Sequence, residues 1–442
     1  MGETLPPRPI PTLIQGAMVL LPTTVGAGLR RVETDVYLDA GVIASIGTEP
    51  SGFVRSTAQH IDARGLLLMP AMVDLCARYG TEAAAWPEAA ACGIAAFVSP
   101  GVAHVDCRAA MHRRAEADGT DRDIDDDVLG NVVCPGVDAD TAPLAWGSTF
   151  DASFDGIADY AGLQEAMLRA KAAGVPLWVR PQDRTLVAGG VMASGPFAVR
   201  LGLPGVPVAA ETQAIDALVA SMRETRAAVH LSRLSSAEGV MRVRDAKAEG
   251  LALTCDVAAH QLHLIDVDIG WFDSRFRFDP PLRAAGDREA LRQGLADGTI
   301  DAICSDHTPH RARDKQVPFA EAPAGAPGFA RLLALTVKWA EEDRIPLVEA
   351  LSKLTSVPAG IAGVPAGRIA VGASADLVLL DPDDYWQAVA INGAVSGASE
   401  SRAASPFADF ELPAPIRRTW LAGREMSEFW DGSRYADTLQ DR

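Results

Sequence analysis

The chain has 442 residues, and its 40 lysines and arginines stand against 58 aspartates and glutamates, so the formal net charge is −18. Nucleic acids and anionic membrane surfaces are bound by basic faces, so this balance argues against both as partners. Hydrophobic residues make up 48% and charged residues 22% of the sequence, which is typical of a globular rather than a disordered chain.

The N-terminus and the cysteines indicate a cytoplasmic protein. The first residues lack the basic stretch and long apolar core of a signal peptide. No apolar run in the sequence reaches the roughly 18 residues that a membrane span requires. The six cysteines are scattered without a Cys-x-x-Cys pair, as expected for reduced thiols in the cytoplasm. The acidic run at 121–127 is interpreted as a solvated loop.

The sequence pattern changes twice along the chain. Residues 12–65 are short apolar runs broken by Gly, Pro and Asp, with a predicted hairpin that turns at Asp39-Ala-Gly41. From residue 66 onward, helical patterns alternate with short apolar strands, and after residue 363 short-strand sequence returns. The predicted helices lie at 161–173, 208–225, 236–248 and 288–295, and the strands that follow them at 175–179, 228–231, 251–257 and 300–305.

This order of elements predicts the fold class. Repeated strand–helix alternation is typical of a parallel sheet with helical crossovers. We expect an α/β protein, with a (β/α)8 TIM-type barrel at residues 66–363. The two flanks, 1–65 and 364–442, are expected to meet in a small β-sandwich domain built from both termini.

Polar residues at the predicted strand ends are the candidates for function, because parallel barrels carry their sites there. Asp306, His307 and His310 leave the end of the strand at 300–305 together. A carboxylate in that place can ligate a metal, accept a proton or pair with a cation, or simply cap backbone amides. His260 and His263 follow the strand at 251–257 in the same way, although each alone is more often a structural histidine.

Several segments in order resemble one known family. Asp301-Ala-Ile-Cys-Ser-Asp-His-Thr-Pro-His310 is similar to its Asp-His-Ala-Pro-His element, and Thr254-Cys-Asp-Val-Ala-Ala-His-Gln-Leu-His263 to its Thr-Cys-Glu-Val element. Asp279-Pro-Pro-Leu-Arg283 resembles its Asn-Pro-Pro-Leu-Arg, and Ser405-Pro-Phe407 a C-terminal signature. Over almost its whole length, the chain thus resembles the dihydroorotase branch of the amidohydrolase superfamily.

The resemblance implies a metal-dependent cyclic amidase whose active members hold one or two zinc ions. Their ligands are four histidines, a carboxylated lysine or an aspartate, and one further aspartate. In this chain that last aspartate is Asp306, and the bridging position falls near Asp155. His260, Asp279 and His310 match the family's substrate pocket, and Gly80 replaces its substrate-binding arginine. The four histidine positions are occupied by Cys76, Arg78, Arg180 and Arg233.

These replacements argue against a metal. A guanidinium group has five donors, no free lone pair and a permanent charge, so it cannot coordinate zinc. Without a metal-bound hydroxide the family's nucleophile is absent, which leaves Asp306 vestigial. We therefore expect no metal cofactor, and we expect at least one of Arg78, Arg180 and Arg233 to pair with Asp306 or Asp155.

Three functions remain open on the sequence. The resemblance favours a catalytically silent dihydroorotase-like protein of pyrimidine biosynthesis, a homo-oligomer that acts as a structural partner of an aspartate transcarbamoylase catalytic subunit. The first alternative is an active cyclic amidohydrolase with a rebuilt site of Asp306, His260, His263 and Cys76, with one zinc ion or none. The second alternative is a non-catalytic sensor of a pyrimidine precursor.

Overall fold

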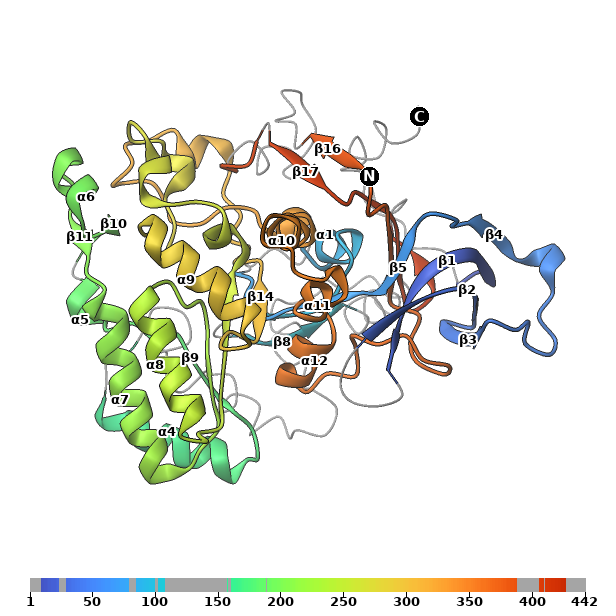
Figure 1. The fold of residues 1–442 in the computed structure, drawn as a ribbon, viewed down its shortest axis with the longest axis horizontal. Coiled ribbons are helices and arrows are strands. Elements are labelled where there is room, and N and C mark those ends of the chain that lie inside the picture. The colour runs from blue at the N-terminus through green and yellow to red at the C-terminus, as the bar shows by residue number, and fades with distance from the viewer. Residues whose placement is uncertain are drawn as a thin grey trace, which may run out of the picture.

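The computed structural model (Figure 1) describes residues 9–23, 29–78, 85–99, 102–107, 157, 160–187, 189–387, 405–408 and 410–426. A large sheet built from both ends of the chain lies on one side, and the helical layers α7, α8 and α9 lie on the other (Figure 1). Strand β14 (Ala302–Cys304) is drawn between these two parts.

Eight strands form the large sheet, in the order β19-β18-β15-β5-β1-β2-β3, with β4 pairing with β1. Hydrogen bonds join all eight strands, which come from both termini, into a single sheet, where the sequence predicted a β-sandwich. The predicted hairpin turn is present at Ala40 and Gly41, which both have positive φ. The strands are Thr12–Pro22 (β1), Leu29–Asp39 (β2), Val42–Ile46 (β3), Gln59–Asp62 (β4), Leu67–Pro70 (β5), Leu377–Leu380 (β15), Ile416–Leu421 (β18) and Arg424–Glu425 (β19).

Strand β5 of this sheet is buried on both faces. Alternation along β5 sends Leu68 to a core that includes Ile14 and Trp420, and sends Leu67 and Met69 to the larger core beneath the helices. Strand β5 belongs to the large sheet, because it pairs with β1 on one side and with β15 on the other. It lies just beyond residue 65, where the sequence placed the domain boundary. The transition from this sheet to the parallel strands therefore falls near Ala71.

A second group of strands is parallel, as the sequence predicted. β9, β12, β13 and β14 are neighbours in one parallel sheet, and β6 pairs in parallel with β7. A parallel bridge between Ala77 and His307 joins β6 to β14. The parallel strands are Met72–Asp74 (β6), Ile94–Ser99 (β7), Leu177–Val179 (β9), Val229–Leu231 (β12), Leu253–Ala258 (β13) and Ala302–Cys304 (β14). Val102–Asp106 (β8) pairs antiparallel with β7. Residues 108–156 of the predicted barrel lie outside the described part of the chain, so its closure stays a prediction.

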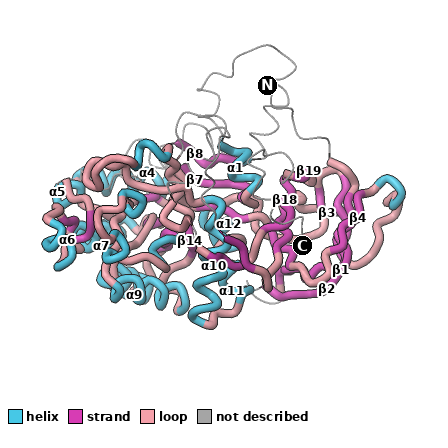
Figure 2. The backbone as a smooth tube through the Cα atoms, turned by 90° about the horizontal axis from the view of Figure 1, so that it is seen from above, coloured by secondary structure: helices cyan, strands magenta, loops and turns pink. Residues whose placement is uncertain are grey.

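The four predicted helices are present at α4, α7, α8 and α9. Helix α4 ends before Gly174, which has a φ of 73° and so takes the left-handed conformation that glycine favours. The helices surround the parallel strands (Figure 2). They are Ala85–Ala91 (α1), Ala161–Ala172 (α4), Arg184–Val187 (α5), Pro196–Leu201 (α6), Ala209–Thr225 (α7), Ala237–Ala248 (α8), Ala285–Ala296 (α9), Phe329–Asp343 (α10), Leu347–Ser352 (α11) and Ser356–Ala362 (α12). Two short strand pairs complete the described elements: Met192–Ala193 (β10) with Gly205–Val206 (β11), and Tyr385–Gln387 (β16) with Glu411–Pro413 (β17).

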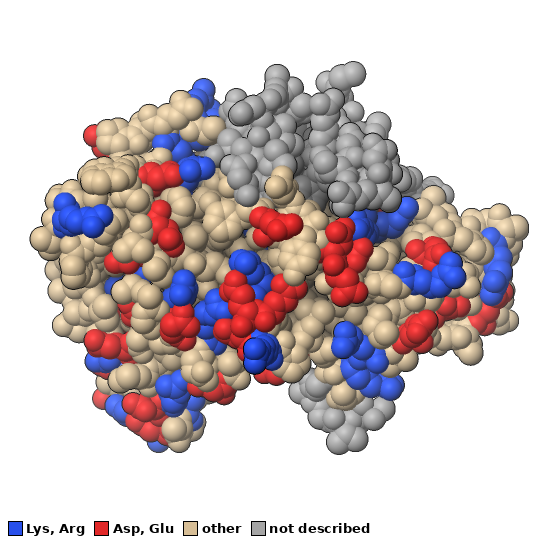
Figure 3. Space-filling view, turned by 45° about the horizontal axis from the view of Figure 1, so that its top comes forward, with Lys and Arg blue, Asp and Glu red and all other residues tan. Residues whose placement is uncertain are grey.

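The described surface carries both signs of charge. Acidic and basic side chains are interspersed on the face drawn in Figure 3. Within the ranges given above, no helix has the length and apolar composition that crossing a membrane requires.

The start of α8 is fixed by a buried carboxylate and a glycine. Glu211 accepts hydrogen bonds from the backbone amides of Ser235 and Ser236, at 2.9 and 3.0 Å. The Ser236 side chain caps α8 by accepting from the Gly239 amide. A Cβ atom on Gly239 would overlap Oε1 of Glu211, so only glycine fits at this position.

We expect Gly239→Ala to lower the free energy of unfolding by about 1–3 kcal/mol, because the added methyl group must displace a hydrogen-bonded carboxylate. The matched control is Gly286→Ala in α9, where a Cβ meets no heavy atom within 4 Å. That control should be neutral or stabilise the protein by about 0.4–1 kcal/mol. Urea unfolding of both variants measures the difference, and equal effects would contradict the proposed overlap.

Candidate functional site

The candidate site lies where β6, β9, β12 and β14 end. Arg180 directly follows β9, and Cys76, Arg233 and Asp306 each lie two residues beyond their strands. Arg233 and Asp306 have φ values of 63° and 47°, so the backbone turns sharply at both positions. Left-handed backbone at two non-glycine residues is uncommon, and such strain is concentrated at functional sites and ligand clamps.

Arg233 and Asp306 form a buried ion pair at the centre of the site. Nη1 of Arg233 lies 2.9 Å from Oδ1 of Asp306, and the two side chains are 1% and 3% exposed. Burial raises the pKa of Asp306, while the charges of Arg233 and Arg180 act in the opposite direction. Burial alone would lower the pKa of Arg233, but Cys76, Asp306 and Asp279 together raise it above its usual value. The expected pairing of an arginine with Asp306 is therefore present.

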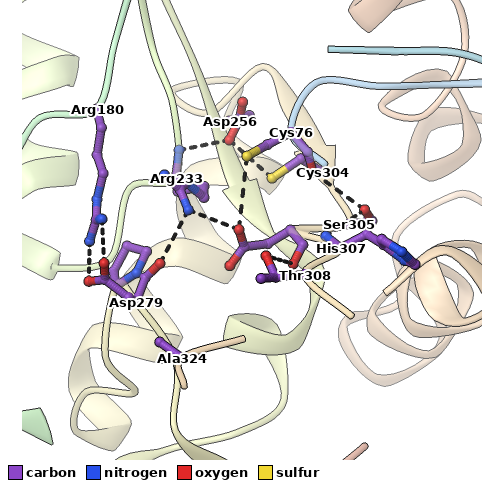
Figure 4. Close-up of polar contacts among 12 residues, drawn as sticks. Cys76, Arg180, Arg233, Asp256, Asp279, Cys304, Ser305, His307, Thr308 and Ala324 are labelled. Atoms are coloured by element: carbon purple, nitrogen blue, oxygen red, sulfur yellow. Dashed lines mark hydrogen bonds and ion pairs between the residues drawn. The ribbon is translucent and has the colours of Figure 1, made fainter. Parts of the chain in front are cut away.

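Arg180 and Asp279 form the second pair (Figure 4). Both terminal nitrogens of the guanidinium bind the carboxylate, Nη1 at 2.6 Å from Oδ2 and Nη2 on Oδ1. Arg180 is 1% exposed, whereas the Asp279 side chain is 39% exposed. Burial would raise the pKa of Asp279, but Arg180, Arg233 and Arg277 lower it well below its usual range. The Asp279 carboxylate thus covers a buried cation on the side that faces solvent.

Arg233 joins the two pairs. The same Nη1 that binds Asp306 also donates to the backbone carbonyl of Asp279, at 3.2 Å. The backbone amide of Arg233 donates to Oδ1 of Asp256, at 2.8 Å. Figure 4 shows Arg233 between Asp279 on one side and Asp256 and Cys76 on the other.

Two further buried carboxylates lie beneath the arginines, and the sequence reasoning did not single them out. Asp256 accepts from Nε2 of His230 at 2.9 Å, and the other ring nitrogen of His230 lies 2.9 Å from Oγ1 of Thr254. Asp74 accepts from the Ser305 amide at 2.9 Å and from the Ser305 hydroxyl. Burial raises the pKa of Asp74 to about 7. Each of these aspartates lies within an otherwise apolar strand, and a charged side chain is buried there only when it has a hydrogen-bonding or charged partner. This pattern could have identified both residues from the sequence.

The thiols of Cys76 and Cys304 lie among these carboxylates. Sγ of Cys304 is 3.3 Å from Oδ1 of Asp256, and Sγ of Cys76 is 3.9 Å from Oδ1 of Asp306. Burial, together with the neighbouring Cys76 and Asp256, raises the pKa of Cys304 well above its usual value. Both cysteines are buried and free of disulfide bonds.

The structure does not gather all the predicted residues at one point. His260 stacks on Phe278 beside the site, with ring centroids 3.9 Å apart. His263 instead lies 2.8 Å from the Leu335 carbonyl through Nε2. His310 lies 2.8 Å from the Ala324 carbonyl, and its pKa is lowered by burial. Arg78 is exposed, and Asp155 and Gly80 lie outside the described residues. His263 is thus bonded to the backbone of α10.

The residues present do not fit a zinc centre. Oδ1 of Asp306 accepts from a guanidinium, which neither binds a metal nor loses its charge at neutral pH. A divalent cation about 4 Å from that guanidinium would be repelled by several kcal/mol even at an effective dielectric constant of about 20. Among the described residues, no three His, Cys, Asp or Glu side chains are grouped so that they could hold a metal.

The buried His260 makes stability depend on pH. Burial lowers the pKa of His260 to about 3 from its ordinary value of 6.5. Between these values the unfolded chain binds a proton that the folded chain does not, so stability is complete above pH 6.5 and falls as the pH is lowered. We expect His260→Phe, which keeps an aromatic ring against Phe278, to reduce this dependence by about 1.4 kcal/mol per pH unit between pH 6 and 4.

Urea unfolding of both proteins at several pH values tests this expectation. Asp74 acts in the opposite direction, because its raised pKa makes the folded state bind the extra proton between pH 3.8 and about 7. It is present in both proteins, so it cancels in the comparison. Parallel stability curves for the wild type and His260→Phe would contradict a buried neutral His260.

The fold and the strand-end site together define an α/β protein whose charged side chains gather at the carboxyl ends of parallel strands. The chain belongs to the amidohydrolase family, whose model matches residues 179–426. That range includes Arg180, Arg233, Asp279 and Asp306.

Its relatives are dihydroorotases and dihydroorotase-like proteins. The dihydroorotase-like protein of Pseudomonas aeruginosa is 33% identical over 438 residues, covering 93% of this chain and 98% of the relative. The dihydroorotase of Citrifermentans bemidjiense is 31% identical over 394 residues, covering 85% and 91%.

Solved structures of related enzymes share the fold. The dihydropyrimidinase of Brevibacillus agri aligns with a TM-score of 0.70 at 18% identity and covers 94% of this chain and 95% of its own. The L-hydantoinase of Arthrobacter aurescens aligns with a TM-score of 0.70 at 20% identity and covers 94% and 96%. At this level of identity the likeness concerns the fold alone.

Proposed function

We propose that this protein is a dihydroorotase-like pseudoenzyme that carries out no metal-dependent hydrolysis. The observation that supports this most directly is the Arg233–Asp306 ion pair, since the aspartate that the family uses at its metal centre here binds a fixed organic cation. The Arg180–Asp279 pair provides the second buried cation. The arginines would then replace the charge of the metal ions as structural parts of the site.

Elemental mass spectrometry of the protein after incubation with zinc and desalting tests the absence of a metal. We expect a stoichiometry near zero and no turnover of dihydroorotate. The dihydroorotase of Citrifermentans bemidjiense, assayed in the same way, is the positive control. One or more tightly held zinc ions per chain, or measurable hydrolysis of dihydroorotate, would overturn the proposal.

For the role in the cell, we propose a structural part in pyrimidine biosynthesis, as a cytoplasmic homo-oligomer bound to an aspartate transcarbamoylase catalytic subunit. The resemblance in sequence to dihydroorotases supports the pathway, and the loss of the metal ligands supports a non-catalytic part in it. Size-exclusion chromatography of the mixed purified proteins tests the partner. A complex that elutes ahead of both components is expected, and separate elution at micromolar concentration would contradict it.

The sensor of a pyrimidine precursor is the second candidate, and one observation favours it. Arg180, Arg233 and Arg277 all lower the pKa of Asp279, so three guanidinium groups converge on the mouth of the site. The carboxylates around them are Asp279, Asp306 and Asp256. An anionic precursor would bind by displacing the partly exposed Asp279 carboxylate from Arg180. Calorimetric titration with dihydroorotate and carbamoyl aspartate separates this candidate from the structural one, because only the sensor binds them.

A further inference from the structure

A small cavity lies beside the arginine site, on the far side of His260. It has a volume of about 20 Å³ and lies between the segment after β13, the segment after β14 and the first turn of α10. His260, Phe278, Gly328, Arg331, Leu335 and Phe407 are among the residues that line it. A cavity needs roughly 10–15 Å³ to hold one water molecule, so this one has room for a single small ion or molecule.

One buried polar atom in the cavity wall lacks a partner among the described residues. His260 is only 5% exposed, and its buried Nε2 has no hydrogen-bond partner among the described residues. Burial, Arg233 and His263 lower the pKa of His260, so the ring is neutral and has one N–H to donate. An unpartnered buried donor costs about 1–3 kcal/mol, which indicates that an acceptor occupies the space in solution.

The charges around the cavity are positive. Arg331, which is 5% exposed, brings a guanidinium to the wall, and no Asp or Glu is found among the described lining residues. Helix α10 spans Phe329–Asp343 and borders the cavity with Arg331 and Leu335, so the positive N-terminal end of the helix lies close by. The amides of Gly328 and Phe329 share a single acceptor, Nδ1 of His307, at 3.2 and 3.3 Å.

We propose that this cavity is a binding site for a small inorganic anion, either a halide or a small oxyanion, held by His260 and Arg331 beside the start of α10. Helix N-termini that follow the last strands of α/β folds are common anion sites. The anion would accept from Nε2–H of His260 and lie beneath Ser405–Phe407, which close the cavity from the C-terminal side. This proposal does not depend on the proposed function, because no arginine of the Asp306 site takes part.

Anomalous diffraction from crystals of the wild-type protein soaked in sodium bromide locates the site directly. A bromide peak within hydrogen-bond distance of Nε2 of His260 is expected. Parallel soaks in sodium phosphate distinguish an oxyanion from a halide by the shape of the density. An ordered water molecule in the cavity in every soak would overturn the proposal.

Thermal unfolding tests binding in solution. Sodium bromide is varied at constant ionic strength, with sodium gluconate as the balancing salt because gluconate is too large for the cavity. We expect a saturable rise in Tm, with the folding equilibrium constant about 11-fold higher when bromide reaches ten times its Kd. Arg331→Gln should abolish the rise, and Arg344→Gln, which removes the same charge at the exposed C-terminal end of α10, should keep it.

A rise of equal size in Arg331→Gln and in the wild type would show a general salt effect and overturn the proposal. If Arg331→Gln fails to fold, the bromide map of the wild-type crystal decides the question alone.

Discussion

Arg233→Met is expected to lower the free energy of unfolding at pH 7 by about 3–5 kcal/mol, one of the two largest effects expected for this protein. The substitution leaves the Asp306 carboxylate, which is 3% exposed, without the guanidinium that lies 2.9 Å from its Oδ1. Methionine fills a similar volume, so loss of packing is a minor contribution. Urea unfolding followed by circular dichroism measures the change.

Two further variants show how much of this loss of stability comes from the unpaired buried charge. Arg233→Met with Asp306→Leu removes both ions, and it should recover at least half of the lost stability, because paired removal of buried charges is often tolerated. Arg242→Met breaks an exposed pair with Asp216, whose nitrogen and oxygen are 2.9 Å apart, and should cost less than about 1 kcal/mol. If Arg233→Met costs no more than Arg242→Met, the buried pair is not the element that stabilises the site.

Local signals in the sequence predicted most of the fold. Helix α4 ends before Gly174 and α8 begins after Ser236 because a left-handed glycine and a side-chain cap act over a few residues. The parallel pairing of β12 with β13 follows from an apolar strand, a helix and another apolar strand in succession. The pairing of β5 with β15 links residues about 310 positions apart, and no local pattern reports such a contact.

The site was predicted in part, for a physical reason. The chemistry of arginine and aspartate predicted that a guanidinium would neutralise Asp306, and Arg233 does so. The partner of Arg180 was not predicted, because Asp279 comes from a loop 99 residues away. The sequence grouped His263 with His260 because both follow the same strand. The 3₁₀ turn at Ala259–Leu262 separates them, so that His260 stacks on Phe278 whereas His263 bonds to the Leu335 carbonyl. The sequence therefore predicted the charged residues of the two ion pairs, but not the loop conformations that position them.

The two ion pairs differ in their access to solvent, and this decides how each can be probed. Asp306 and Arg233 are both enclosed, so nothing from solution can replace either partner without unfolding. Arg180 is equally enclosed, but its carboxylate partner is 39% exposed. Removal of the Asp279 side chain would therefore open a path from solvent to a buried, bidentate guanidinium.

Asp279→Ala is accordingly expected to destabilise the protein and to be rescued by small carboxylates. We expect a loss of roughly 2–3 kcal/mol, less than for a fully buried pair because Asp279 is partly solvated. Formate or acetate has the charge and the two oxygens that the Arg180 fork binds. Titration with sodium formate at constant ionic strength should restore Tm in a saturable way, because the anion binds only the folded state.

The double variant Arg180→Met, Asp279→Ala tests whether the rescue acts through this guanidinium. It removes both charges, so formate should stabilise it no more than it stabilises the wild type. An equal response of the single and double variants would place the formate site elsewhere. A rescued Asp279→Ala would establish that the mouth of the site keeps a carboxylate-binding fork, which in the native chain is occupied by the protein's own Asp279.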